Sequence, residues 1–152
     1  MNNKIISIPS FRGGVGNSNV VANLAATMAL QGKKVGIIDT DIQSPGIHVI
    51  FGLDEEKVQY SLNDYLWGYC QIQDTAYDVS YILKGRSNFY GNGNGNDRGK
   101  YNRANLGEGS LHLIPSSIKA GEIARILREG YDVGRLNDGF QELLFSLDLD
   151  YL

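Results

Sequence analysis

The chain has 152 residues and a net charge of −3, and 42% of its residues are hydrophobic. This length fits one domain with a buried core of its own. The composition gives no electrostatic reason to expect nonspecific nucleic-acid binding.

Cys70 is the single cysteine, so an intramolecular disulfide is excluded and no second cysteine stands at metal-ligand spacing. We expect a buried or half-buried thiol without a reactive role. The apolar run at the N-terminus is too short for a signal peptide, and no stretch approaches the roughly 20 apolar residues that span a bilayer. The sequence therefore predicts a cytoplasmic protein, and nothing in it indicates contact with a membrane.

The first 39 residues predict a strand, a glycine loop, a helix and a second strand. Residues 4–8 form a short apolar run that is typical of a strand buried on both faces. From Ser18 the sequence is apolar nearly all round, which predicts a buried helix closed by Gly32. Residues 33–39 are again rich in β-branched side chains. This order predicts a right-handed βαβ unit with two parallel strands.

The middle of the chain predicts one helix, one strand and a long insertion. Ser61 is placed as the N-cap of a short helix, with Asp64 as its capping-box partner. Residues 77–83 alternate enough to predict an edge strand. Residues 88–109 are rich in Gly and Asn, and we expect a flexible insertion because this tract offers little apolar surface to bury.

After the insertion the pattern returns to alternating strands and helices. Residues 111–117 predict a strand, and residues 118–130 predict a helix with an Arg125–Glu129 pair. A further core-facing helix follows, for which Asp138 and Gln141 are placed like an N-cap and its box partner. The final residues, DLDYL, begin an apolar run that is typical of a new strand.

The stretch FRGGVGNSNV, residues 11–20, has the glycines of a phosphate-binding loop but no lysine. Such a loop works because backbone N–H groups and a helix N-terminus point at phosphate, while a lysine neutralises charge and a hydroxyl ligates Mg²⁺. Gly13, Gly14 and Gly16 supply the turn and Ser18 stands at the hydroxyl's place, but Asn17 replaces the lysine. Because the loop lies between a predicted strand and helix, the sequence favours a nucleotide site over a ligand-free turn.

Three stretches carry a resemblance to a known family: FRGGVGNSNVVANLAA, GKKVGIIDTDIQSPGIHVIFGL and LIPSSIKAGEIARILREGYD. Together they resemble the MinD/ParA family of P-loop ATPases, whose deviant Walker A loop reads KGGxGK[ST]. The resemblance covers nearly the whole chain apart from the Gly/Asn insertion. It implies an α/β, three-layer P-loop NTPase-like fold with a mostly parallel sheet. It also implies that residues 1–152 are a single incomplete domain, truncated before the Walker B strand.

The resemblance also implies roles for particular residues. Arg12 matches the lysine that reaches the partner's phosphates in an ATP-sandwiched dimer, and Asn17 matches the lysine on the β/γ-phosphates. Mg²⁺ would be held by Ser18 and Asp39, and Asp41 would orient the attacking water. The loop residues implied to bind ATP are Gly13, Gly14, Val15, Gly16, Asn17 and Ser18. A homodimer is implied when nucleotide binds, with a protein cargo or partner that the sequence leaves open.

The substitution at Asn17 leaves two further readings open. A neutral amide loses a charge-assisted contact where transition-state charge develops, so the alternative is a noncatalytic relic or weak phosphate-binding module. A Rossmann oxidoreductase fits poorly, because Asn19 stands where the last glycine of G-x-G-x-x-G belongs. His48 and His112 are expected to be a loop-helix residue and a strand residue, not catalytic groups.

Overall fold

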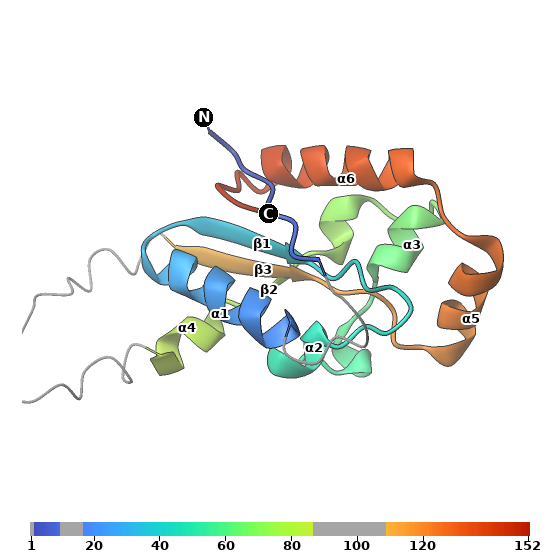
Figure 1. The fold of residues 1–152 in the computed structure, drawn as a ribbon, viewed down its shortest axis with the longest axis horizontal. Helices are drawn as coiled ribbons and strands as arrows, with labels where there is room; N and C mark the ends of the chain where they lie inside the picture. Colours follow the sequence, from blue (N-terminus) through green and yellow to red (C-terminus); the bar gives the residue numbers. More distant parts are fainter. Residues whose placement is uncertain (1, 10–16, 87–108) are drawn as a thin grey trace, which may run out of the picture.

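A three-stranded sheet lies at the centre of the molecule (Figure 1). The strands are β1 (Lys34–Ile38), β2 (Tyr77–Asp78) and β3 (Ser110–Ile114), in the order β1-β3-β2. β1 and β3 are parallel, in register from Lys34↔Ser110 to Ile38↔Ile114, whereas β2 is antiparallel to β3. The computed structural model describes residues 2–9, 17–86 and 109–152.

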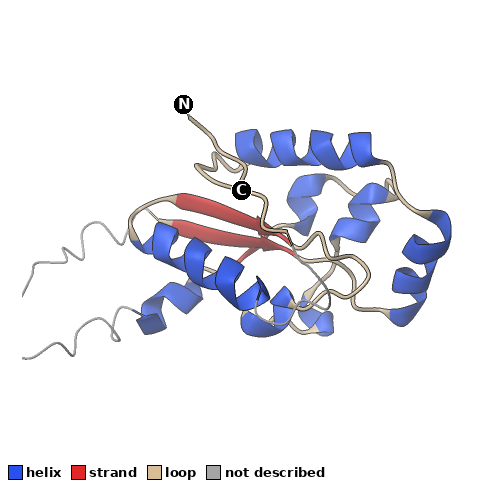
Figure 2. Cartoon of the chain, in the orientation of Figure 1, coloured by secondary structure: helices blue, strands red, loops and turns tan. Residues whose placement is uncertain are grey.

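Six helices surround this sheet within the described residues (Figure 2). Helix α1 covers one face of the sheet, and α6 lies on the opposite side with α3 (Figure 1). Short 3₁₀ turns η1 (Glu55–Lys57) and η2 (Ile72–Thr75) connect the elements between β1 and β2. The helices are α1 (Asn17–Leu30), α2 (Ile47–Ile50), α3 (Leu62–Leu66), α4 (Tyr81–Arg86), α5 (Ala120–Glu129) and α6 (Val133–Ser146).

The core consists of two clusters of buried side chains, one on each face of the sheet. Val35, Ile37, Leu111 and Leu113 point to the α1 side, where four alanines of the helix pack against the strands. Ile114 belongs to the other cluster, which includes leucines of α3 and α6. This arrangement of helices on both faces of a β-sheet confirms the predicted α/β, three-layer class. The alternating side-chain directions of β1 and β3 explain why both strands are buried on two faces.

The two ends of the chain lie side by side and extend the sheet beyond β1. The N–H groups of Lys4 and Ile6 donate to the carbonyls of Asp150 and Leu152, at 3.0 and 2.8 Å. Tyr151 forms parallel bridges both to Lys4 and to Val35 of β1. The strand expected to begin at DLDYL is therefore present as an isolated bridge segment between β1 and the N-terminus.

The N-terminal segment differs from the prediction of a strand buried on both faces. Ile5 and Ile6 are 46% and 45% exposed, and residues 2–7 are all exposed. The reason is that, among the described residues, this segment has a pairing partner along one edge only.

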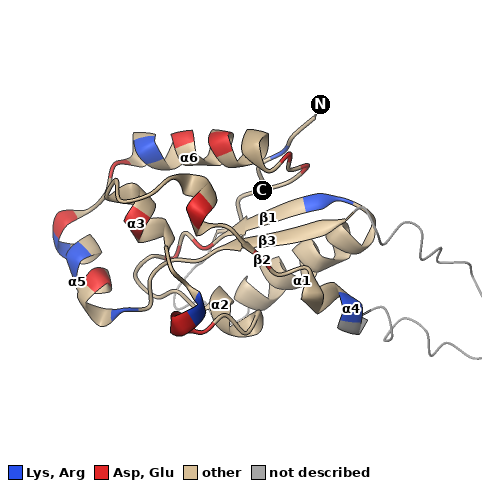
Figure 3. Cartoon of the chain, turned by 180° about the vertical axis from the view of Figure 1, so that it is seen from behind, with Lys and Arg blue, Asp and Glu red and all other residues tan. Residues whose placement is uncertain are grey.

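Helix α1 is confirmed, including the closing Gly32 with φ of 90°, but it is not buried all round. Val20 and Leu24 are 55% and 42% exposed, whereas its alanines face the sheet. Figure 3 shows that α1 carries no charged side chain, in contrast to α5 and α6.

Two further boundaries correct the sequence-based expectations. The strand expected over residues 77–83 ends at Asp78, whose carboxylate accepts a hydrogen bond from Ser80 N, and α4 follows. The N-cap of helix α6 lies six residues before the expected one: Asp132 is the cap and accepts from the N–H groups of Gly134 and Arg135. Asp138 lies inside this helix.

Several other expectations are confirmed. Ser61 and Asp64 form the capping box of α3, and Arg125 pairs with Glu129 at 2.9 Å. His48 lies on α2 and His112 on β3.

Within the part of the chain that the structure describes, no helix is long and apolar enough to cross a membrane. The expected insertion at residues 88–109 lies, except for Gly109, outside the described residues.

Candidate functional site

The expected phosphate loop lies largely outside the described residues. Arg12, Gly13, Gly14, Val15 and Gly16 all belong to the part of the chain that is not described. Asn17 is the first residue of α1, and Ser18, in the first turn, is partly buried. In the sequence, the N-terminus of α1 therefore directly follows the glycines, which is the order that a phosphate-binding loop requires.

Asp39 follows the last residue of β1 and is almost fully buried, with 8% exposure. Its two carboxylate oxygens accept hydrogen bonds from Asp41 N at 3.1 Å and Gly46 N at 3.3 Å. Burial raises the pKa of this carboxyl, and the backbone hydrogen bonds of its own loop oppose that shift. Asp39 thereby organises the loop that follows β1.

Asp41 lies in this loop and is exposed. Its N–H is held by the Asp39 carboxylate, and its carbonyl accepts from Ser44 N at 3.2 Å. The loop thus fixes the backbone of Asp41 and leaves its side chain open to solvent. Such an arrangement suits a carboxylate that meets a ligand or a water molecule.

The buried carboxylate of Asp39 is a donor that suits a magnesium–phosphate ligand. Mg²⁺ is usually bound by one or two carboxylates together with substrate phosphates. Among the described residues, the buried Asp39 carboxylate has no cationic partner within ion-pair distance. A cation beside it would offset the desolvation that raises its pKa. Under the family resemblance, the Asp39 carboxylate and the Ser18 hydroxyl would hold the metal.

Sequence reasoning missed Ser116, which lies in the loop after β3. Its hydroxyl is buried and donates to the carbonyl oxygen of Asp39 at 2.6 Å. The next residue, Ser117, donates its N–H to Asn63 Oδ1 at 2.9 Å. Small polar residues directly after a buried strand, in the text LIPSS, were the available signal, because ligands gather at the carboxyl ends of parallel strands.

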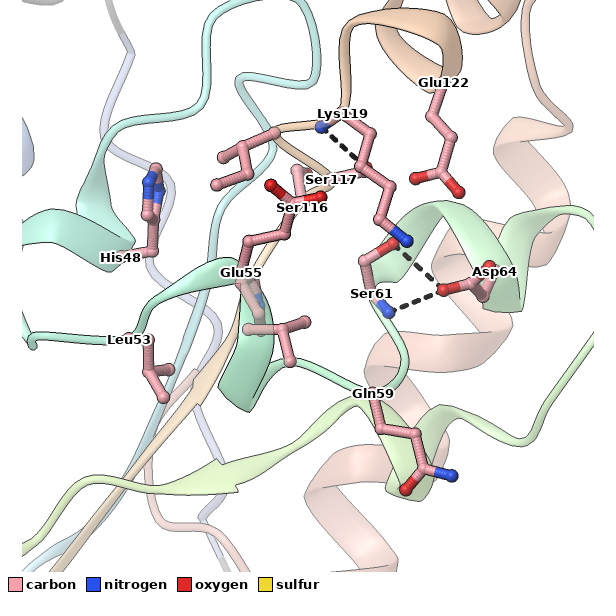
Figure 4. A pocket seen from close by; sticks show the side chains of 13 residues that line it. His48, Leu53, Glu55, Gln59, Ser61, Asp64, Ser116, Ser117, Lys119 and Glu122 are labelled. Atoms are coloured by element: carbon pink, nitrogen blue, oxygen red, sulfur yellow. Dashed lines mark hydrogen bonds between the residues drawn. The ribbon is translucent and has the colours of Figure 1, made fainter.

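A small pocket of about 30 Å³, lined by both polar and apolar side chains, opens beside this loop (Figure 4). Ser116, Ser117 and Lys119 line it from the loop after β3, and Ser61 and Asp64 line it from the start of α3. On its other wall lie side chains from the α2–η1 region, which include His48, Leu53 and Glu55.

Known proteins match the chain at both the sequence and the fold level. Residues 2–74 match the family model ParA, described as "NUBPL iron-transfer P-loop NTPase". The cytosolic Fe-S cluster assembly factor CFD1 of Yarrowia lipolytica is 46% identical over 57 residues, which are 38% of this chain and 20% of that protein.

Two solved structures share the fold. The cell division ATPase MinD of Pyrococcus furiosus superposes with a TM-score of 0.65 at 20% identity, over 99% of this chain and 48% of that one. MinD of Pyrococcus horikoshii, solved with Mg-ADP, gives a TM-score of 0.64 at 21% identity, over 98% of this chain and 46% of its own. The chain thus spans about half the length of these structures.

The matched residues 2–74 include the glycine loop, α1, β1 and both aspartates of the following loop. Over these residues the chain resembles the ParA-type P-loop NTPases, and it shares the fold of the MinD ATPases.

Proposed function

We propose that this chain binds Mg·ATP as part of a MinD/ParA-type ATPase and acts as a nucleotide-dependent dimerisation and positioning switch. The observation that carries the proposal is the family match over residues 2–74, which spans the glycine loop and the loop after β1. The proposed ligands are the backbone of residues 13–16, the N-terminus of α1 and the hydroxyl of Ser18. Mg-ADP in the MinD structure of Pyrococcus horikoshii supports this class of ligand.

The roles proposed for the two aspartates come from the family resemblance, and their burial supports them. Asp39, buried at the carboxyl end of β1, would help to hold Mg²⁺, and the exposed Asp41 would orient the attacking water. Arg12 would contact the phosphates of a second copy in a nucleotide-bound homodimer, since a guanidinium can fork onto phosphate. The partner or cargo that such a dimer positions is the open part of the proposal.

An iron–sulfur cargo has less support within these 152 residues. Protein-held clusters are usually bound by several thiolates, and Cys70 is the single cysteine. Burial, together with the nearby Asp64 and Asp74, raises the pKa of its thiol to about 11. Cluster assembly is a function of CFD1, and these 152 residues alone give no reason to extend it to this chain.

The second candidate is a weak phosphate-binding module without catalysis, and Asn17 favours it. Without the lysine, transition-state charge on the phosphates loses a charge-assisted contact. A loss of about 3 kcal/mol lowers a rate roughly a hundredfold. We expect phosphate release from Mg·ATP to be near background. A rate typical of an ATPase, abolished by Asp41→Ala, would overturn that expectation.

Replacing Asn17 by lysine tests nucleotide binding directly. If Asn17 is the main defect, Asn17→Lys tightens Mg·ATP binding by about 1.5–3 kcal/mol, the worth of a hydrogen bond to a charged group. This corresponds to a Kd lower by roughly 10- to 150-fold. Titration of labelled ATP against both forms gives the comparison.

Asn19→Lys is the matched control, because it adds the same charge to the first turn of α1 at an exposed position. We expect it to change the Kd little. Equal gains from both variants would mean that overall charge, not the loop, governs binding. No gain from either would contradict the role given to Asn17.

A further inference from the structure

The loop after β1 is held to the rest of the molecule at Asp39. Its N–H donates to Ile114 O at 3.1 Å and continues the parallel pairing of β1 with β3. Its carboxylate accepts from the N–H groups of Asp41 and Gly46. The position of Asp41 therefore depends on where Asp39 is held.

Ser116 makes the next connection between the two strands. In a parallel ladder the carbonyl of Asp39 would accept from a backbone N–H one step further along the neighbouring strand. That donor would be the N–H of Ser116, because the N–H of Asp39 donates to the carbonyl of Ile114. The structure has the Ser116 hydroxyl donating to the Asp39 carbonyl at 2.6 Å, and this residue is 3% exposed.

The loop that carries Ser116 is itself anchored to α3. Leu62 N donates to Pro115 O at 2.8 Å, and Ser117 N donates to Asn63 Oδ1 at 2.9 Å. Asn63 and Ser117 are both buried. Ser116 thus connects this anchored loop to the carbonyl group of Asp39, which organises the loop of residues 39–46.

From this geometry we infer that Ser116 is a positioning residue, whose hydroxyl fixes the loop that presents Asp41. The inference rests on the proposed function for the role of Asp41, but the connection itself exists in the nucleotide-free chain. Its loss would leave the buried carbonyl of Asp39 without this donor. The loop would then be released at its first residue, and Asp41 and Gly46 would lose a fixed acceptor.

Amide hydrogen exchange, measured by NMR on the nucleotide-free chain, tests the inference. In Ser116→Ala we expect the amides of Asp41 and Gly46 to exchange about three- to tenfold faster, the effect of one net hydrogen bond. The amide of Gly36 in β1, which donates to Tyr151 O, should keep its exchange rate. Ser116→Thr retains the hydroxyl and should restore slow exchange at both positions.

Ser117→Ala is the matched control, because it removes a neighbouring hydroxyl that accepts from Lys119 N and has no bond to Asp39. It should leave the exchange of Asp41 and Gly46 unchanged. Unchanged exchange of these amides in Ser116→Ala would overturn the inference, as would an equal effect of Ser117→Ala. Ser116→Ala could also lower global stability. In that case, exchange that accelerates at Gly36 as much as at Asp41 and Gly46 would contradict a local role for Ser116. Failure of ATP binding would overturn the proposed function and leave this result intact.

Discussion

Cys70 illustrates how the surroundings of one side chain decide its chemistry. The thiol is half-buried beside α3, and burial is the largest cause of its raised pKa, followed by the charges of Asp64 and Asp74. The pKa rises to about 11. The thiolate is the reactive form of cysteine, so this group is protonated at neutral pH. The expected half-buried, unreactive thiol agrees with this environment.

We predict that iodoacetamide alkylates Cys70 at least about tenfold more slowly at pH 8 than a free cysteine. At that pH the thiolate fraction is lower by roughly two orders of magnitude, and the higher nucleophilicity of a more basic thiolate recovers part of the rate. The rate in the folded chain should continue to rise up to about pH 11. The same chain in urea is the control and should level off near the ordinary thiol pKa of about 8.5. A folded-state midpoint near that value would contradict the prediction.

At the scale of elements, α3 and α6 are joined through one aromatic ring. Tyr65 OH donates to Arg135 O at 2.8 Å, and Arg135 Nε donates to Tyr65 O at 2.6 Å. The ring of Tyr65 also lies against Gly139, where a Cβ atom would approach Tyr65 Cε1 to 2.9 Å. Gly139 is in the interior of α6, although glycine is a poor helix former. The close approach of Tyr65 explains its presence.

We predict that Gly139→Ala destabilises the chain by about 1–3 kcal/mol, the usual cost of overpacking a filled site. Gly121→Ala in α5 is the matched control, since a Cβ there meets nothing within 4 Å. It should stabilise the chain by up to about 1 kcal/mol through helix propensity. Urea unfolding of both variants gives the free energies of unfolding. Equal stabilisation by the two alanines would contradict the prediction, because it would show that the ring of Tyr65 can move aside without a loss of stability.

Short sequence patterns correctly predicted the elements that depend on residues close together in the chain. The capping box of α3 depends on two residues three positions apart, Ser61 and Asp64, and it was predicted correctly. The start of α6 was predicted wrongly: Asp138 was placed as its N-cap, although the apolar spacing already begins at Leu136. The structure has Asp132 as the cap, which accepts from the N–H groups of Gly134 and Arg135.

Long-range contacts account for what the sequence did not predict. In residues 77–83 the apolar Val79 and Leu83 suit a strand or one face of a helix equally well, and both are buried in the core beside α1. The role of Ser116 depends on its contact with Asp39, 77 positions away in the sequence. The phosphate loop was predicted from its glycines and stays a prediction, because residues 10–16 lie outside the described part of the chain.

At the scale of the whole molecule, the last residues of the chain connect the N-terminus to the sheet. Gly36 N donates to Tyr151 O at 2.9 Å, while Ile6 N donates to Leu152 O at 2.8 Å. Leu149, 1% exposed, anchors this segment in the core cluster that includes leucines of α3 and α6. It also lies against Gly36, where a Cβ would approach Leu149 Cδ1 to 2.8 Å. The segment before the glycine loop is therefore placed through residues far away in the sequence.

We predict that Leu149→Ala destabilises the chain by about 2–5 kcal/mol, because truncating a buried leucine loses apolar contact and leaves a cavity. The cavity lies beneath the segment that pairs with residues 4–6, so amide exchange at Ile6 and Gly36 should accelerate. Phe145→Ala is the control: this side chain is 88% exposed at the end of α6, and its removal should change stability by less than about 0.5 kcal/mol. Urea unfolding and NMR amide exchange measure the two effects.

If Leu149→Ala lowers stability while exchange at Ile6 stays unchanged, the N-terminal segment is held independently of the C-terminal one. In that case the geometry of the loop after Ile8 would have to depend on contacts other than the pairing of the two chain ends.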